Sequence, residues 1–248
     1  MLKDFLKNII TLASDFKVEQ IKIKPSQDSI VNFAMKSPSG TIIYGQSKTP
    51  YPELKYGLGI TNISLLNKIF SNDIITENIT LKEDTNPVTN NIEYTELCFS
   101  QKSSKLNYRL SSLEVLDKII LVKNDGYDIE IDNIDDENLM NILKKLDLAS
   151  AINEDITFIT NNNELIAASG AKSKNNSEIS ICDNISRINN NLSLKDISWK
   201  VADIKVAMAF GRSKFQNANL KISNKGAFYV IKENDEIIVN VKNIGNRK

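Results

Sequence analysis

The stretch LKDFLKNIITLA, residues 2–13, has the spacing of an amphipathic α-helix that opens the fold. Its apolar side chains recur every three or four residues and form one stripe, made of Leu2, Phe5, Leu6, Ile9, Ile10 and Ala13. A second long helix is predicted to begin at Asp135 or Asp136, where a carboxylate can cap the free amides of its first turn. The core side of that helix holds Leu139, Ile142, Leu143 and Leu146.

Alternating apolar and polar residues follow each long helix, which is typical of half-buried β-strands. Strands are predicted at residues 18–24, 29–36, 41–46, 54–60, 75–82, 93–101, 106–110, 127–131, 156–160, 164–168, 178–182, 219–223, 227–232 and 236–241. Short helices are predicted at 62–70 and 201–209, about 60 and 65 residues after the starts of the long ones. The same order therefore occurs twice. It predicts an α+β protein of two similar domains, each an antiparallel sheet with two helices on one face.

Composition limits the class of protein. The chain has 248 residues, 41% apolar and 25% charged, which is normal for one large or two ordinary globular domains. No apolar run approaches the roughly 18–20 residues that span a membrane. The first residues are amphipathic and include Asp4, so they do not resemble a secretory signal. We expect a cytoplasmic protein that does not bind membranes.

Several kinds of chemistry are excluded by the residue types. The chain has no histidine, which removes Ser-His-Asp and Cys-His nucleophiles and histidine-ligated metals. Its two cysteines, Cys98 and Cys182, are far apart and are predicted to be buried free thiols. The acidic run 132–137 lacks the glycine and distant glutamate of a calcium loop and is interpreted as a helix cap. Carboxylate chemistry stays open, but no carboxylate pair is singled out.

The charge balance limits how nucleic acid could be bound. Thirty-one basic residues balance 31 acidic ones. Either nucleic acid is not the partner, or the basic residues gather on one face. One half alone would leave the strands at the edges of its sheet unpaired. Copies joined edge to edge would pair these strands, and they form a ring if the rotation from one copy to the next closes. Basic residues on helices that line the hole would then attract phosphates while the outside stays acidic.

Three segments resemble one family. Residues 56–69, YGLGITNISLLNKI, resemble the strand-into-helix element of DNA polymerase sliding clamps, the processivity factors. Residues 5–9, FLKNI, resemble the first helix of clamps from T-even-type phages, and residues 226–231, GAFYVI, resemble their last hairpin. The resemblance to this T-even-type and PCNA-like family covers most of the chain in order and spacing. The length fits two-domain, trimeric clamps and not three-domain, dimeric bacterial ones.

The resemblance implies a homotrimeric, pseudo-sixfold ring that encircles duplex DNA without reading sequence. It would tether the replicative DNA polymerase, be opened by an ATP-driven clamp loader, and have neither catalytic site nor cofactor or metal. The implied domains are 1–112 and 127–248, with a connector at 113–126. A phage protein of this kind would act in the host cell cytoplasm.

The resemblance also implies two sites. The DNA-facing residues would be Lys3, Lys7, Lys68, Lys144, Lys145, Lys205, Arg212 and Lys214. Each could instead be part of an ordinary solvated helix face, and the acidic Asp4, Asp147 and Asp203 lie on or beside the same helices. The groove for a partner peptide would hold Leu113, Val115, Leu116, Ile119, Leu121, Val241 and Ile244. The alternative is that these side chains pack the core between the domains.

A trimeric viral structural protein, from a tail or baseplate, is the competing hypothesis. An enzyme that uses carboxylates is a third. A structural β-protein has no reason to repeat a long and a short helix at matched offsets with lysines on their polar sides. The repeat therefore favours the clamp.

Overall fold

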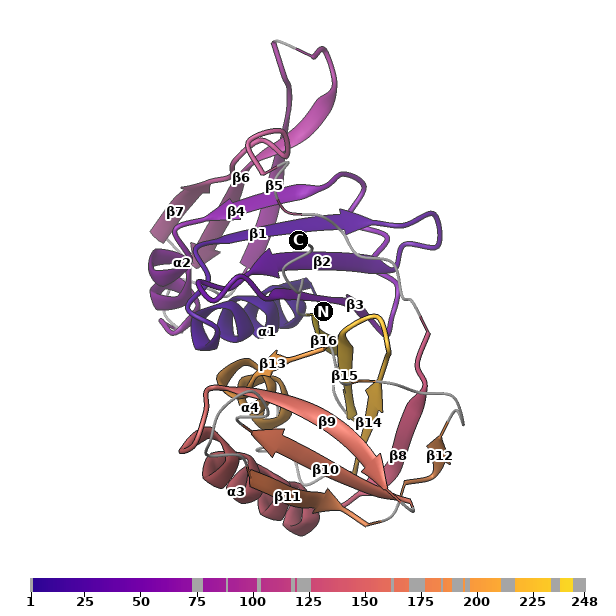
Figure 1. The fold of residues 1–248 in the computed structure, drawn as a ribbon. Helices are drawn as coiled ribbons and strands as arrows, with labels where there is room; N and C mark the ends of the chain where they lie inside the picture. The colour runs from indigo at the N-terminus through magenta and orange to yellow at the C-terminus, as the bar shows by residue number, and fades with distance from the viewer. Residues whose placement is uncertain are drawn as a thin grey trace. The chain divides into compact units, whose positions relative to one another are not determined.

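A computed structural model describes residues 2–72, 78–87, 89–101, 104–116, 119, 126–161, 163–169, 177–183, 185–188, 194, 197–210, 217–232 and 237–242. The chain forms two compact units. Unit 1 consists of residues 1–38 and 44–122, and unit 2 of residues 39–43 and 123–248. Each unit contains antiparallel strands and two helices (Figure 1). The predicted α+β class and the repeated plan are therefore confirmed.

Unit 1 begins with the long helix and contains two groups of strands. Its elements are α1 (Leu2–Asp15), β1 (Gln20–Pro25), β2 (Val31–Lys36), β3 (Ile42–Ser47), β4 (Leu58–Thr61), α2 (Ile63–Phe70), β5 (Asn78–Thr85), β6 (Ile92–Gln101) and β7 (Ser104–Arg109). One group has the order β3-β2-β1-β4, and the other has the order β5-β6-β7. Figure 1 shows α1 and α2 side by side beneath these strands.

The core of unit 1 follows from the apolar stripe of α1. Phe5, Leu6 and Ile9 are fully buried. The ring of Phe5 lies 4.7 Å from that of Tyr51, measured between centroids. An edge-to-face contact at 5.6 Å between Phe70 and Phe99 joins α2 to β6. Aromatic pairs of this kind prefer tilted geometry, so they fix the helices on the sheets as well as excluding water.

Unit 2 repeats the plan. Its elements are β8 (Ile129–Ile134), α3 (Asp136–Ser150), β9 (Asp155–Asn161), β10 (Glu164–Ser169), β11 (Ser177–Cys182), β12 (Arg187–Ile188), β13 (Trp199–Lys200), α4 (Val201–Ala209), β14 (Ala218–Ile222), β15 (Ala227–Lys232) and β16 (Ile237–Lys242). The strand orders are β12-β8-β14-β15-β16 and β11-β10-β9-β13. The buried Trp199 donates from Nε1 to the carbonyl of Gly226 at 3.1 Å, and its ring contacts Phe158 at 5.2 Å.

Asp135 is the helix cap, one of the two residues that the sequence offered for this role. Its side chain accepts a hydrogen bond of 2.7 Å from the backbone amide of Asn138, which satisfies one free donor of the first turn. Asp136 and Glu137 follow in that turn, where negative charge favours the helix dipole. The capping interpretation of this acidic run is confirmed.

Several strands have other bounds than predicted: those expected at 75–82, 106–110 and 127–131 are observed as β5, β7 and β8, and the short strands β12 and β13 were not predicted. The strand expected at 54–60 begins only at Leu58, because the amide of Leu54 donates to Tyr51 and that of Lys55 to the hydroxyl of Tyr94. Those two amides close a turn and are not available to a strand. Cys98 and Cys182 are free, as predicted, but half-buried and not buried. No helix in the described part of the chain is long and apolar enough to cross a membrane.

Candidate nucleic-acid interface and partner groove

The polar side of the two helices in unit 1 holds three of the predicted DNA-facing lysines. Lys7 and Lys68 are exposed and Lys3 is half-exposed. Each helix buries its apolar side, so its polar side, which carries these lysines, faces away from the core. Asn67 of α2 donates to the hydroxyl of Ser14 in α1 at 3.2 Å. This bond holds the helices together, so the three lysines belong to one two-helix layer.

The lysines of unit 2 are less available. Lys205 of α4 forms an ion pair with Asp147 of α3. Lys145 leans away from the helix and donates to the carbonyl of Ile181 in β11 at 3.3 Å. Lys144 is exposed and has no ion pair within the part of the chain that the structure describes. Arg212 and Lys214 lie outside the described residues.

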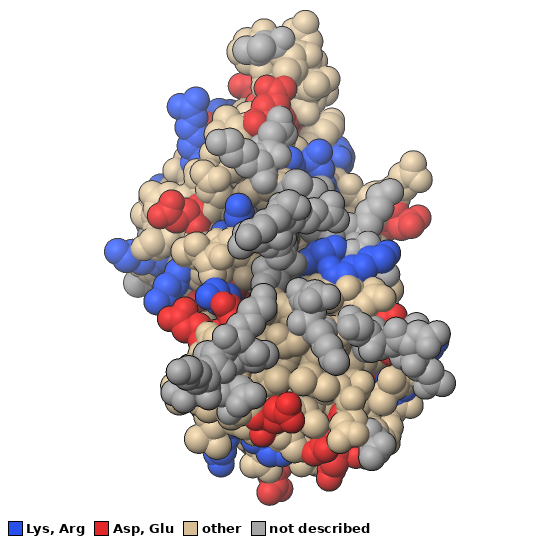
Figure 2. Space-filling view, in the orientation of Figure 1, with Lys and Arg blue, Asp and Glu red and all other residues tan. Residues whose placement is uncertain are grey.

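The acidic residues beside these helices have different surroundings. Asp203 is only 8% exposed and accepts a hydrogen bond of 2.7 Å from the hydroxyl of Ser39, so it does not present its charge to solvent. Asp147 is neutralised by Lys205, and Asp4 is exposed. Figure 2 shows Lys and Arg side chains interspersed with Asp and Glu on the visible face, and not gathered in one large patch.

The residues just before the predicted connector, and its start, pack on β4. The amide of Ser111 donates to the carbonyl of Gly59 at 2.8 Å, and the hydroxyls of Ser111 and Thr61 lie 3.0 Å apart. A Cβ atom on Gly59 would lie 2.2 Å from the backbone carbonyl oxygen of Ser111 and 3.0 Å from Leu116 Cδ1. The glycine therefore allows a close approach that any other residue would prevent.

The residues of the predicted groove have unequal exposure. Leu116 and Ile119 are buried, at 1% and 7% exposure, whereas Val115 is 70% exposed and Leu113 is half-buried. Val241 is fully buried in β16 of unit 2. Leu121 and Ile244 lie outside the described residues. The structure thus brings Leu113 and Leu116 together against Gly57 and Gly59 of the β4 segment.

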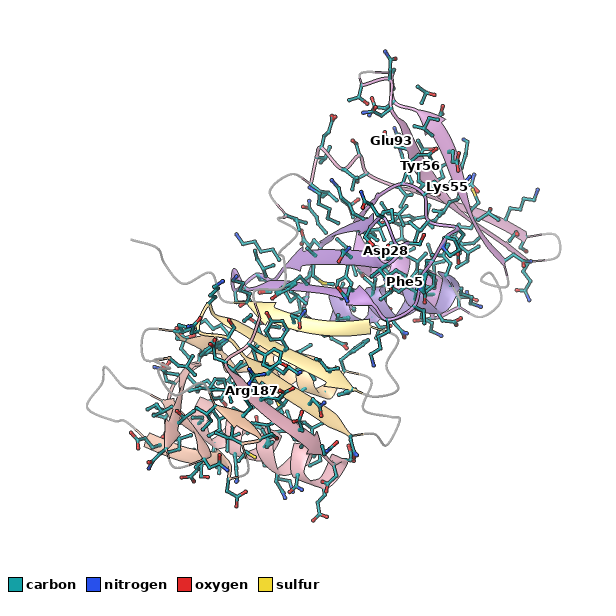
Figure 3. All side chains as sticks on the ribbon, turned by 90° about the vertical axis from the view of Figure 1, so that its right-hand side faces the viewer. Phe5, Asp28, Lys55, Tyr56, Glu93 and Arg187 are labelled. Atoms are coloured by element: carbon teal, nitrogen blue, oxygen red, sulfur yellow. The ribbon has the colours of Figure 1, made fainter. Side chains whose placement is uncertain are left out.

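A cavity of about 360 Å³ lies beside Leu113. Pro25, Tyr56 and Ile92 line it, and none of them was predicted as a site residue. Each is an isolated apolar residue next to a turn, and only the packing of separate segments places them together. Figure 3 labels Tyr56 with its neighbours Lys55 and Glu93, which also line this cavity.

A cluster of cations surrounds Tyr127 at the start of unit 2. Lys221 Nζ lies 4.0 Å from the centre of the Tyr127 ring, and Arg187 Cζ lies 5.8 Å from it. Lys221 also pairs with Glu130. Burial alone would lower the pKa of Lys221, but hydrogen bonds to Glu130 and Tyr127 outweigh it and raise that pKa. The ammonium is therefore a fixed positive charge at neutral pH.

Comparisons with known proteins identify the fold. No family model matches the chain, and no curated protein matches its sequence. Solved structures do match. The PCNA of A. fulgidus, solved with the C-terminal region of FEN-1, is similar over 97% of this chain and 94% of its own, with a TM-score of 0.64 and 10% identity. The Proliferating Cellular Nuclear Antigen of Entamoeba histolytica gives a TM-score of 0.57 and 17% identity, over 96% and 93% of the two chains.

A bacterial structure is similar over less of its length. The Helicobacter pylori beta clamp, bound to a DNA ligase peptide, matches 96% of this chain but only 62% of its own, with a TM-score of 0.57 and 10% identity. These similarities show that the chain has the fold of PCNA and beta clamps, at about the length of the PCNA chains.

Within the described residues, no cluster of three His, Cys, Asp or Glu side chains could hold a metal ion.

Proposed function

We propose that this chain is one subunit of a sliding clamp that encircles duplex DNA and tethers the replicative DNA polymerase. The observation that carries the proposal is the similarity of nearly the whole chain to PCNA, in both of its repeated halves. The clamp is a scaffold without catalytic site or cofactor. A viral tail or baseplate β-protein is not favoured, because it gives no reason for a repeated pair of helices with lysines on their polar sides.

The finer identity rests on chain length and on the sequence resemblance. The chain matches 94% of the A. fulgidus PCNA chain and 62% of the H. pylori clamp, which favours a homotrimer over a dimer. Its domains would be residues 1–112 and 127–248, with the connector at 113–126. The resemblance of residues 5–9 and 226–231 to T-even-type phage clamps favours a viral clamp that acts in the host cytoplasm and is opened by a clamp loader.

Two strand edges support a closed ring. Within the described residues, β7 is an outer strand of unit 1 and β11 an outer strand of unit 2, and such edges pair readily with another chain. β7 carries the exposed Lys105 and Arg109, whereas Glu178 in β11 and Asp183 just beyond it are exposed and acidic. Antiparallel pairing would bring Lys105 toward Asp183 and Arg109 toward Glu178. Head-to-tail joining of this kind produces rings when the rotation closes.

The proposed DNA contacts are few and directed to phosphates. Lys3, Lys7, Lys68 and Lys144 are the residues best placed for them, because Lys145 and Lys205 are engaged with Ile181 and Asp147. A ring that must slide gains from weak, sequence-independent contacts. Enclosure of the duplex would then contribute more to retention than electrostatic attraction.

The experiment has two parts. Native mass measurement is expected to give a trimer, Arg109→Glu to weaken it, and the double change Arg109→Glu with Glu178→Arg to restore it. Lys36→Glu, an exposed lysine on β2, is the matched control and should leave the mass unchanged. With polymerase, loader and ATP, the ring should stay on circular duplex DNA and leave linear DNA. Equal retention on both, or a trimer that never stimulates the polymerase, would favour the structural protein.

A further inference from the structure

The outer strand β5 of unit 1 has one side with no neighbouring strand among the described residues. It ends the sheet β5-β6-β7, and its 8 residues make it the longest outer strand of the described sheets. Figure 1 shows it in the hairpin that projects from unit 1. Backbone amides and carbonyls on the open side of such a strand are available to pair with another extended segment. The ring proposed above would use β7 and β11, and it leaves this side of β5 unused.

Unit 2 shows what covers the equivalent strand. β5 follows the short helix α2, as β14 follows the short helix α4 in unit 2. β14 is flanked on the corresponding side by β8, in an antiparallel pairing that sets Leu220 opposite Ile131 and Ile222 opposite Ile129. All of these side chains are at most 2% exposed. The repeated plan therefore places a strand at this position in unit 2, whereas no described residue does so in unit 1.

The apolar rows of the sheet β5-β6-β7 end half-exposed at β5. Ile79 lies opposite Phe99, and Leu81 lies opposite Leu97. The two residues of β6 are buried, at 1% and 0% exposure, whereas Ile79 and Leu81 are only half-buried. Apolar side chains from a strand beside β5 would continue both rows and remove Ile79 and Leu81 from water. Covering this edge would therefore give unit 1 the burial that β8 gives unit 2.

Only part of the open side of β5 is protected against pairing. Proteins protect open strand edges with charged residues and with β-bulges. β5 has both at its far end, where the pairing with β6 shifts between Lys82 and Glu83, and where the exposed Glu83 and Asp84 follow. Residues 78–82, NITLK, have one charge, and that Lys82 ammonium is paired with Glu96 at 3.0 Å. The unprotected part is therefore residues 78–82, which is long enough to pair with a short added strand.

We propose that β5 is a docking edge for an extended segment of another protein, which joins the sheet as an antiparallel strand. The chemistry of this segment follows from β8, which alternates aliphatic and acidic residues. Its aliphatic side chains would lie opposite Ile79 and Leu81. An acidic residue would lie opposite Lys82, as Glu130 of β8 pairs with Lys221 of β14 in unit 2. This edge is separate from the predicted groove at the connector and from the strands assigned to ring closure.

The probe is a fluorescein-labelled peptide with the sequence of residues 127–135, YDIEIDNID, which contains β8. Fluorescence anisotropy with the full chain is expected to show saturable binding. Leu81→Lys should weaken it at least about tenfold, because a charged side chain would interrupt the apolar row that the peptide covers. Leu106→Lys is the matched control. Leu106 is a half-buried leucine in β7, the opposite outer strand of the same sheet, so its change should alter the affinity less than about twofold.

N-methylation of the peptide tests whether it pairs through its backbone. The amides of a strand point alternately to its two sides, so only every second amide of the peptide can face β5. One peptide is methylated on the amides of Ile129 and Ile131, and another on those of Glu130 and Asp132. One of the two should lose affinity at least about tenfold, and the other should bind nearly as well as the parent peptide. Contact through side chains alone would give both methylated peptides the same affinity.

Absence of saturable binding, or equal effects of the two methylations, would overturn the proposal. So would an affinity that Leu81→Lys leaves unchanged, because the peptide would then be replacing β8 in unit 2. A native mass that is twice that of the ring and is halved by Leu81→Lys would assign the edge to a second copy instead. Thermal unfolding shows whether each variant is folded, and the methylated peptides decide the question if Leu81→Lys is not. Failure of the proposed function would appear separately, in the DNA-retention assay and in the effect of Arg109→Glu on the mass.

Discussion

Leu116→Ala tests whether the connector is anchored by its own apolar residues or offers them to a partner. The leucine is 1% exposed and lies against Gly59, and its carbonyl accepts from the Nζ of Lys22 at 3.5 Å. Removing three buried carbons loses about 2.4 kcal/mol of transfer free energy, at ~0.8 kcal/mol each. The cavity left behind brings the expected loss in the free energy of unfolding to about 3–5 kcal/mol.

The assay is urea unfolding followed by circular dichroism at one fixed protein concentration, because an assembly makes stability depend on concentration. Val115→Ala is the matched control. Val115 is adjacent in sequence but 70% exposed, so its change should stay within about 0.5 kcal/mol. The fluorescence of Trp199, the only tryptophan, reports unit 2 and shows whether the loss is confined to unit 1. A loss below about 1 kcal/mol for Leu116→Ala would refute the reasoning that this residue is part of the core.

Three further changes have expected outcomes. Gly59→Ala should destabilise unit 1 by about 1–3 kcal/mol, since its Cβ would meet the Ser111 oxygen at 2.2 Å, and hydrogen exchange should show the connector released. Partial desolvation raises the pKa of Asp15, a residue that is exposed overall, so folding slightly disfavours its charged form, and this small penalty appears as the pH rises through the folded pKa. Asp15→Asn should therefore raise the melting temperature slightly at neutral pH. It should not raise it below about pH 3, where the Asp15 carboxyl is neutral in both the folded and the unfolded protein. Glu130→Gln leaves the ammonium of Lys221 without its carboxylate, which should lower the pKa of Lys221 by NMR titration and stability by about 1–3 kcal/mol.

Much of the fold could be predicted because local periodicity is a property of neighbouring residues. The helix predicted at 201–209 and the strand at 227–232 have the observed bounds. The cap could be narrowed to Asp135 or Asp136 because a capping side chain bonds to an amide within three residues, and the bond from Asn138 shows that it is Asp135. The strand expected at 54–60 was wrong in its first half, because the amide of Lys55 bonds to Tyr94, thirty-nine residues further on.

The candidate site was predictable as a set of residue types but not residue by residue. Lys144 and Lys145 are adjacent and chemically identical, yet one is exposed and the other donates to Ile181. Val115 and Leu116 are equally apolar neighbours, and one is exposed while the other is buried. These differences arise from contacts with segments far along the chain, which no local pattern contains.

The sequence by itself determined the α+β class, the repeat of a long and a short helix, and the absence of histidine chemistry. Those properties depend on composition and on spacing within a few residues. Only the tertiary structure decided that Gly59 brings the connector onto β4 and that Tyr56, Ile92 and Leu113 line one cavity. The physical reason is that burial and cavities depend on which distant segments meet, and that is set by close packing over the whole unit.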